Sequence, residues 1–370
     1  MQRRHFFLGA LGSTALVRPA FSQSSSSPLG VGVIGVGNRG SYDMQAAMAQ
    51  PEVKITALCD IKPDRLDKAA SGAAAHKPAT FKDYRELLQR KDVDAVVIAT
   101  PCDLHVEMSL AALKAGKHVY CEKPAGVEPA SIQRLVNAVR ASDRVYLIGQ
   151  QTRSVTRVRR TIAKIREGVI GEVIMVKAQR HASADLPHDS SSNDWFFVAR
   201  RSGDVIVEMS VHNLDVCNWV IDSRPDRAAG FGGALLWKND PPGRTNMDGY
   251  TLSYEYANGV KLSYTQVFFH PNGMPGNGQT NYVYGTKGGV NLDTSTAYSF
   301  ERGVKPVVLA EPEKDPPHAH MAAFLECIRT GKKPFADITV AATAALTAIM
   351  GRDSIYRKQV VTWDSMGVKI

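Results

Sequence analysis

The sequence has few cysteines, and none of them stands in a pairing or metal-binding pattern. Five are present, an odd number with no CxxC spacing: Cys59, Cys102, Cys121, Cys217 and Cys327. This usage argues against a disulfide framework and against a structural zinc site. The first three fall at or just beyond expected strand ends, where a cysteine usually serves as a small buried side chain. No His, Asp and Glu cluster has metal-ligand spacing, so we expect no metal.

The sequence also lacks the basic, aromatic-rich runs of nucleic-acid-binding proteins and the long apolar segments of membrane proteins. The formal net charge is +9, yet no run of Lys and Arg is interleaved with aromatic residues, as nucleic-acid binding would require. No segment after residue 22 is apolar enough to cross a bilayer, which takes roughly 20 residues. The chain of 370 residues is long enough for two domains. We expect neither a nucleic-acid nor a membrane partner, and the mildly basic balance suits an anionic cofactor or substrate.

The first 22 residues have the pattern of a targeting segment. Arg3 and Arg4 precede an apolar stretch from Phe6 to Val17, and residues 20–22 end it with a small-x-small pattern. These features are typical of a secretory signal peptide, and the arginine pair resembles a twin-arginine signal. We therefore expect export to the periplasm. An ordinary secretion signal, or a frayed N-terminus on a cytoplasmic protein, is the alternative.

A glycine-rich turn follows the first expected strand. Leu29–Ile34 is a short apolar run, and Gly35, Gly37 and Gly40 follow in GxGxxG spacing before a helical pattern over Ser41–Ala49. Between a strand and a helix, this motif predicts a dinucleotide site. The first glycine allows the tight turn, the second lets the backbone approach the pyrophosphate, and the third lets helix and strand pack closely. The helix N-terminus then offers free N–H groups to the phosphates.

An acidic residue ends the second expected strand. Asp60 closes the run from Val53, about 20 residues after the last glycine, where a carboxylate accepts hydrogen bonds from the adenosine ribose. The same charge repels a 2′-phosphate, so Asp60 favours NAD over NADP. Lys62 and Arg65 nearby keep NADP open, and a helix N-cap before Pro63 is the structural alternative for Asp60.

Strands and helices continue to alternate up to about residue 149. Buried strands over Asp94–Thr100 and Lys117–Glu122 are each followed by a helical pattern, which predicts a parallel sheet with right-handed crossovers. Ligands bind beyond the carboxyl ends of such strands. Thr100-Pro101 and Glu122-Lys123-Pro124 stand at these ends, so we expect them beside the cofactor.

The second half of the chain has a different pattern of apolar and polar residues. Alternating runs predict a mostly antiparallel sheet with one wetter face: Glu172–Arg180, Ala228–Trp237, Tyr250–Tyr256, Lys261–Phe269 and Tyr282–Asp293. Residues 257–259 read as a hairpin turn, 270–280 as a loop and 317–357 as helical. The predicted organisation is a signal peptide (1–22), a linker (23–28), an α/β Rossmann domain (29–149) and an α+β domain (150–370). We expect homo-oligomers through the open face of the second sheet.

Three ionisable residues share one predicted helix in the second domain. Glu208, His212 and Asp215 lie at i, i+4 and i+7 of the pattern from Gly203 to Trp219, and therefore on one face. Flanking carboxylates would orient the imidazole and raise its pKa, as suits a general base that takes a hydroxyl proton. A merely solvated helix face is the alternative.

The ordered set of motifs resembles the glucose-fructose oxidoreductase, inositol dehydrogenase and MocA (Gfo/Idh/MocA) family. It comprises the glycine turn, Thr100-Pro101-x-x-Leu104-His105, Glu122-Lys123-Pro124, Glu208-x-x-x-His212-x-x-Asp215, Gly285-Thr286-Lys287-Gly288 and the ending His320-x-x-x-Phe324 to Pro334. The resemblance covers the chain from Leu29 onward. It implies a Rossmann domain, an open-faced sheet domain and an active site between them.

The resemblance also implies roles for individual residues. Lys123 and His212 would act at the reacting hydroxyl beside the nicotinamide. The family usually has Asp four residues before the histidine, whereas this chain has Glu208, whose carboxylate reaches about one methylene further. The implied cofactor-binding set is Gly35, Gly37, Asn38, Arg39, Gly40, Asp60, Thr100, Pro101, His105, Glu122 and Lys123. Candidate substrate contacts are Arg153, His188, Trp195 and Asp215. A surface salt bridge is the alternative for Arg153, and a loop anchor is the alternative for His188 and Trp195.

The resulting functional hypothesis is an NAD(P)-dependent oxidoreductase for a carbohydrate. It would move a hydride between a sugar or polyol carbon and a tightly held nicotinamide cofactor. Because the family also contains NAD-dependent glycosidases that oxidise, eliminate and re-reduce, a redox-neutral glycosidase is the alternative. A cofactor-binding protein that catalyses no reaction is a minor alternative. The presence of both Lys123 and His212 argues against it.

Overall fold

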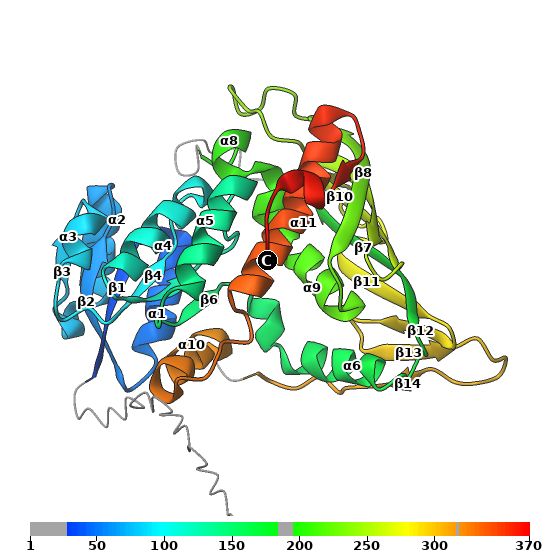
Figure 1. Cartoon of the computed structure of the whole chain (residues 1–370), viewed down its shortest axis with the longest axis horizontal. Helices are drawn as coiled ribbons and strands as arrows, with labels where there is room; N and C mark the ends of the chain where they lie inside the picture. Colours follow the sequence, from blue (N-terminus) through cyan, green and yellow to red (C-terminus); the bar gives the residue numbers. More distant parts are fainter. Residues whose placement is uncertain (1–27, 184–194, 316–317) are drawn as a thin grey trace, which may run out of the picture.

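The computed structural model describes residues 28–183, 195–315 and 318–370 (Figure 1). The expected signal peptide and all but the last residue of the expected linker lie outside the described residues, as does His188. Two sheets organise the rest of the chain, as expected. No helix among the described residues is long and apolar enough to cross a membrane.

The first sheet is parallel throughout, with strand order β3-β2-β1-β4-β5-β6. Its strands are β1 (Leu29–Ile34), β2 (Val53–Cys59), β3 (Ala79–Phe81), β4 (Ala95–Ile98), β5 (His118–Cys121) and β6 (Tyr146–Ile148). The central strands are β-branched and fully buried, which is typical of a parallel sheet covered on both faces. This confirms the expected Rossmann sheet. The three-residue β3 is too short to leave a periodic signal, and the sequence did not predict it.

Helices α1 (Asn38–Met48), α2 (Pro63–Gly72), α3 (Tyr84–Leu88), α4 (His105–Lys114) and α5 (Pro129–Arg140) surround this sheet. Their starts follow local chemistry. Pro63 and Pro129 occupy the first turns of α2 and α5, where a missing N–H costs nothing. The Asp83 carboxylate caps α3 by accepting from the Arg85 N–H.

The second sheet has nine strands in the order β14-β13-β12-β11-β7-β10-β9-β8-β15. They are β7 (Val173–Ser183), β8 (Pro225–Gly233), β9 (Gly249–Tyr256), β10 (Lys261–His270), β11 (Gly278–Gly285), β12 (Gly288–Asn291), β13 (Thr296–Ser299), β14 (Val307–Val308) and β15 (Val361–Thr362). All neighbours are antiparallel except β7 and β10. The mostly antiparallel sheet is therefore confirmed.

Two details of this sheet differ from the prediction. The single strand expected over Tyr282–Asp293 is two strands, because the chain reverses between Gly285 and Gly288 and β11 pairs with β12. A Cβ on Gly285 would lie 2.3 Å from the Ile170 carbonyl oxygen, so this turn needs glycine. The expected loop over 270–280 is also shorter, since β11 begins at Gly278.

One face of the second sheet is covered by helices and the other is open. Helices α6 (Thr156–Arg166), α9 (Val211–Ile221) and α11 (Ile338–Arg357) lie on the inner face, and α8 (Ala199–Ser202) and α10 (Ala319–Thr330) lie towards the Rossmann domain (Figure 1). Along β10, buried and less buried residues alternate. The exposed residues Met175 on β7, Tyr282 and Tyr284 on β11 and Tyr298 on β13 make the outer face partly apolar.

The helix expected from Gly203 to Trp219 is not continuous. A π-helix, η4 (Ile206–Ser210), precedes α9, and Gly203 and Asp204 have positive φ. The wider π turn changes the angular spacing between Glu208 and His212, so the simple i, i+4 relation is wrong. π-helical turns are rare and often occur at functional sites.

Candidate active site

The glycine turn has the geometry of a phosphate cradle. Gly35 has φ +83°, and a Cβ on Gly40 would lie only 1.7 Å from the Gly35 carbonyl oxygen, so both positions need glycine. Helix α1 starts after Gly37 with no side-chain cap and no acidic residue in its first turn. Its leading N–H groups are therefore available to an anion, where the helix dipole also favours negative charge.

Asp60 stands at the carboxyl end of β2 and helps to hold this turn. Its carboxylate accepts hydrogen bonds from the Val36 N–H and the Lys62 N–H, both at 2.9 Å. The residue is buried, so the carboxylate orientation is fixed. The expected contact with a ribose remains a prediction.

Arg39 connects the turn to the carboxyl end of β5. Its guanidinium donates to Glu122 Oε1 from Nε at 2.9 Å and from Nη2 at 2.8 Å, and it lies 3.0 Å from Asp43 Oδ1. Burial, followed by the charge of Glu122, raises the pKa of Asp43 to about 8, although Arg39 acts in the opposite direction. Two predicted cofactor residues thus meet, and Asp43 joins them. No sequence signal marked Asp43, which sits on the buried face of α1.

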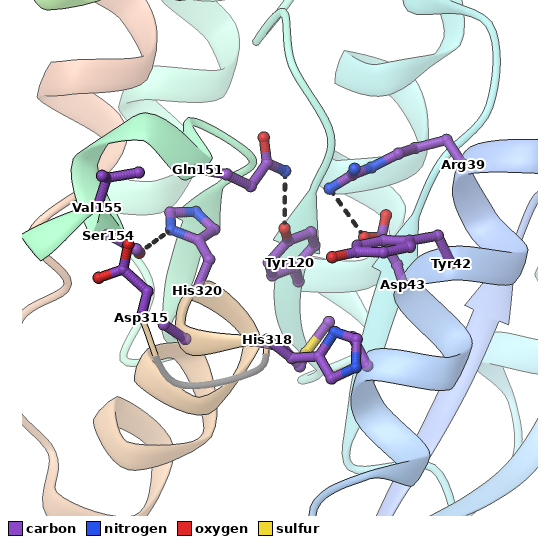
Figure 2. A pocket seen from close by; sticks show the side chains of 13 residues that line it. Arg39, Tyr42, Asp43, Tyr120, Gln151, Ser154, Val155, Asp315, His318 and His320 are labelled. Atoms are coloured by element: carbon purple, nitrogen blue, oxygen red, sulfur yellow. Dashed lines mark hydrogen bonds and ion pairs between the residues drawn. The ribbon is translucent and has the colours of Figure 1, made fainter. Parts of the chain in front are cut away.

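Figure 2 shows a pocket of about 150 Å³ beside this ion pair. It lies between α1, the end of β5, the turn η3 (Gln151–Ser154) and the start of α10. Gln151 Nε2 donates to Glu122 Oε1 at 2.6 Å and to the Tyr120 hydroxyl at 3.1 Å. His320 accepts from or donates to Ser154 Oγ at 2.8 Å through Nδ1 and lies 2.8 Å from the Ile148 carbonyl oxygen through Nε2. Gln151 connects this pocket to the Glu122 network.

Lys123 and Glu208 form a largely buried ion pair across the two domains. Lys123 Nζ lies 2.5 Å from Glu208 Oε1 and donates to the Glu208 carbonyl oxygen at 2.7 Å. Burial acts to lower the pKa of Lys123, but the charge and hydrogen bond of Glu208, together with Cys102 and Glu122, outweigh burial and raise the pKa. Lys123 therefore carries its charge at neutral pH. Glu208 is bound to the lysine, and no Glu208–His212 hydrogen bond is present among the described residues.

His212 is held by an amide instead of a carboxylate. Its Nδ1 lies 3.0 Å from Gln150 Oε1. Burial, then the positive charges of Lys123, Arg180 and Arg39, lowers the pKa of His212 well below its usual value. The sequence prediction of a raised pKa is wrong, because both expected carboxylate neighbours are paired with cations. The site therefore presents a neutral imidazole next to an ammonium group.

Arg153 and Asp215, two candidate substrate contacts, bind each other. Arg153 Nε and Nη2 each donate to an Asp215 oxygen at 2.8 Å, and the guanidinium lies 5.0 Å from the centre of the Trp219 ring. Both side chains are nearly buried. Burial raises the pKa of Asp215, and Arg153 opposes that rise. The geometry assigns this pair to the support of α9.

His105 is a link between loops. Nδ1 lies 2.7 Å from the Pro124 carbonyl oxygen and Nε2 lies 2.9 Å from the Thr100 carbonyl oxygen. Burial opposes a charge on this ring, but its contacts with Cys121 and the two carbonyls outweigh burial and raise the pKa to about 9. Both nitrogens are engaged and the side chain is buried, so His105 holds the Thr100-Pro101 loop against the Lys123-Pro124 loop.

Trp195 is half-buried and packs edge-on against Phe196, at the end of the segment that the structure does not describe. His181 lies on β7 with its Nε2 at 3.0 Å from Thr265 Oγ1. All five cysteines are free and buried, which confirms the burial predicted for Cys59, Cys102 and Cys121. Within the described ranges, no group of three or more His, Cys, Asp or Glu side chains could hold a metal ion.

Comparison with known protein families assigns both domains. Residues 29–150 match an oxidoreductase family model described as an NAD-binding Rossmann fold, and residues 158–291 match the model of the GFO/IDH/MocA C-terminal domain. The two ranges together cover more than half of the chain. They follow one another in the order that the motifs predicted.

Individual relatives have different activities in their names. A glycosyl hydrolase family 109 protein of Saccharopolyspora erythraea is 33% identical over 177 residues, covering 44% of this chain and 39% of that protein. A myo-inositol 2-dehydrogenase of Thermotoga maritima is 25% identical over 206 residues, covering 56% and 59%. The alignments thus span about half the length of these curated relatives or less.

Solved structures agree on the fold. A levoglucosan dehydrogenase in complex with NADH and levoglucosan superposes with a TM-score of 0.77 at 21% identity, covering 91% of this chain and 99% of that one. At this identity the likeness establishes the fold alone. With the two matched domain models and the geometry above, the chain belongs to the Gfo/Idh/MocA family of NAD-binding oxidoreductases.

Proposed function

We propose that this protein oxidises a hydroxyl carbon of a sugar or polyol with NAD, and that His212 and Lys123 carry out the proton chemistry. The observation that carries the proposal is that His212, held by Gln150 at 3.0 Å, lies within electrostatic reach of Lys123, held by Glu208 at 2.5 Å, at the junction of the two domains. His212 accepts the proton of the hydroxyl group. Lys123 supports the developing negative charge on that oxygen.

The residues present fit a nicotinamide dinucleotide. The uncapped start of α1 and the glycines at 35, 37 and 40 suit the pyrophosphate, and Asp60 suits the hydroxyls of an adenosine ribose. A Cβ on Gly37 would meet only the Arg65 guanidinium, so the space above the turn is otherwise open. The carboxyl edge of the parallel sheet adds four further proposed cofactor contacts: Arg39, Thr100, Pro101 and Glu122. When bound, the nicotinamide accepts the hydride that leaves the substrate carbon.

Other residues of the chain hold Lys123 and His212 in position. Glu208 holds the Lys123 ammonium in place at 2.5 Å, and the Arg153–Asp215 pair supports the helix that carries His212. Burial keeps water from competing for these groups. Trp195 and His188 remain proposed substrate contacts, because aromatic and imidazole side chains can stack on or hydrogen-bond a sugar.

A direct test uses the purified protein, NAD and a panel of sugars and polyols. We expect NADH formation together with a ketone or lactone from at least one substrate. Lys123→Met should lose turnover while keeping cofactor binding. Full activity in that variant would falsify the role of Lys123.

A redox-neutral glycosidase is the second candidate, and the 33% identity to a glycosyl hydrolase family 109 protein favours it. In that cycle one glycoside is oxidised, cleaved by elimination and reduced again. Aryl glycosides separate the two activities. A glycosidase releases the phenol without net NADH, whereas a dehydrogenase leaves the glycosidic bond intact.

We further propose that the protein is exported by the twin-arginine route and keeps its cofactor. An exported enzyme has no ready supply of free NAD, so each full cycle should return the cofactor to its starting state. An oxidoreductase does this by reducing a second sugar after it has oxidised the first, and a glycosidase does it by reducing the cleaved product. Protein purified without added NAD and then heat-denatured should release nicotinamide dinucleotide. An empty protein that makes stoichiometric NADH only with supplied NAD would contradict retention. Fractionation of cells that express the full chain tests export, since Arg3→Lys with Arg4→Lys should keep it inside.

We also propose that the outer face of the second sheet joins two or more copies. Its exposed Met175, Tyr282, Tyr284 and Tyr298 support this, because single proteins seldom leave a large apolar patch in water. Light scattering of the native protein and of Tyr284→Glu tests it, since a charge there should lower the measured mass.

A further inference from the structure

Gln150 occupies a fixed position beside the imidazole of His212. It follows β6 and precedes the turn η3, and its side chain is 1% exposed. Its backbone is anchored on both sides, because its N–H donates to the Ile148 carbonyl oxygen at 2.7 Å and its carbonyl accepts from the Arg153 N–H at 3.0 Å. Its Oε1 lies 3.0 Å from His212 Nδ1. A buried side chain on an anchored backbone has little freedom to turn away.

We propose that Gln150 is a positioning residue that sets the tautomer of His212, so that Nδ1 keeps its hydrogen and Nε2 takes the substrate's proton. This rests on the proposed oxidoreductase function and names how its base is prepared. An amide oxygen only accepts a hydrogen bond, so Nδ1 must be the donor. In a neutral imidazole, the other nitrogen then carries the free lone pair. Within the described residues no hydrogen bond occupies Nε2.

The amide takes this place because the nearby carboxylates are committed elsewhere. Glu208 pairs with Lys123 at 2.5 Å, and Asp215 pairs with Arg153 at 2.8 Å. A carboxylate at Nδ1 would favour an imidazolium, which cannot accept a proton. A neutral amide orients the ring without adding negative charge.

The charged groups around His212 act in the same direction. They come from four elements: Arg39 on α1, Lys123 after β5, Arg180 on β7 and His320 on α10. Each opposes a positive charge on the ring, and Glu208 on η4 is engaged by Lys123. The base should therefore stay neutral, and the acid limb of the pH profile should lie well below the usual histidine range.

The tautomer can be observed without turnover. Nitrogen-15 NMR of the full chain labelled at histidine distinguishes Nδ1–H from Nε2–H, and the spectrum of His212→Ala assigns the signal. We expect Nδ1–H in the unchanged protein and a mixture in Gln150→Ala. Gln150→Glu keeps the shape but adds charge, so it should raise the titration midpoint of His212 by about 1 to 3 units. Gln89→Glu, an exposed change directly after α3, should leave the midpoint unchanged.

Kinetics give the second readout. Gln150→Ala should lower kcat by about tenfold or more with KM nearly unchanged, and Gln150→Glu should move the acid limb of the pH profile upward. Nε2–H as the main tautomer in the unchanged protein, or a midpoint that Gln150→Glu does not move, would overturn the proposal. If no substrate turns over, the oxidoreductase assignment fails while the NMR result still decides the role of Gln150.

Discussion

The glycine turn and the neighbourhood of His212 are built in different ways. The turn consists of backbone groups from one short segment, and its shape depends on Gly35 and Gly40. The histidine's surroundings consist of side chains from both domains, with Lys123 from the first, Gln150 at the boundary and Glu208 from the second. The turn should therefore depend little on the charges around His212, whereas the histidine site depends on a balance of buried charges. The predictions below break one region while leaving the other intact.

The largest expected effect is on turnover. His212→Ala removes the base from the side-chain region, so kcat should fall by roughly 10²- to 10⁴-fold. The backbone turn is untouched, so NADH affinity, followed by fluorescence titration, should change little. A loss of NADH binding as large as the loss of turnover would show that the two regions are not separable.

The next effect is on stability. Arg153→Ala leaves the buried Asp215 without its partner, which should lower the free energy of unfolding by about 3 to 5 kcal/mol. Replacing both residues together, as Arg153→Met with Asp215→Leu, should recover most of that loss. Urea unfolding measures both variants. If the single and double variants are equally unstable, packing against Trp219 matters more than charge.

A pH effect on stability should follow from His320. Burial lowers its pKa to about 4, so the folded protein resists protonation more than the unfolded chain does. This stability is present above about pH 6.5 and is lost as the pH falls towards 4, by about 3 kcal/mol. His320→Gln should flatten that part of the curve of unfolding free energy against pH. An unchanged slope would mean that other groups control acid unfolding.

The smallest expected effect concerns cofactor choice. Asp60→Ala removes the negative charge that would meet a 2′-phosphate, so the preference for NAD over NADP should narrow by about 1 to 3 kcal/mol. Calorimetric titration with both cofactors measures it, and Asp64→Ala on the next helix is a matched control. Equal affinities in the unchanged protein would remove the basis for the prediction. The variant also loses the hydrogen bonds that the Asp60 carboxylate accepts from the Val36 and Lys62 N–H groups. This loss should weaken the binding of NAD and of NADP equally.

The glycine turn could be predicted from the sequence, whereas the surroundings of His212 could not. Gly35, Gly37 and Gly40 act within one segment, so spacing was enough to place them and the parallel sheet around them. Lys123 was found because it follows a buried strand. These features depend on local pattern alone.

The environment of His212 could not be predicted in the same way. Spacing put Glu208 and Asp215 on its face, but Lys123 and Arg153, distant in sequence, bind those carboxylates. The π-helix η4 has only five residues, and over so short a segment its sequence pattern cannot be told from that of an α-helix. The pKa of the histidine therefore came out in the wrong direction, because it depends on tertiary charge pairs.

The central claim is tested most directly by a single turnover. Purified full-chain protein is loaded with NAD, mixed with a panel of sugars and polyols, and followed by NADH fluorescence beside His212→Ala loaded in the same way. We predict a burst of NADH with at least one substrate in the unchanged protein and its near absence in the variant, with equal NAD content in both. Equal bursts in the two proteins would contradict the assignment of His212 as the base.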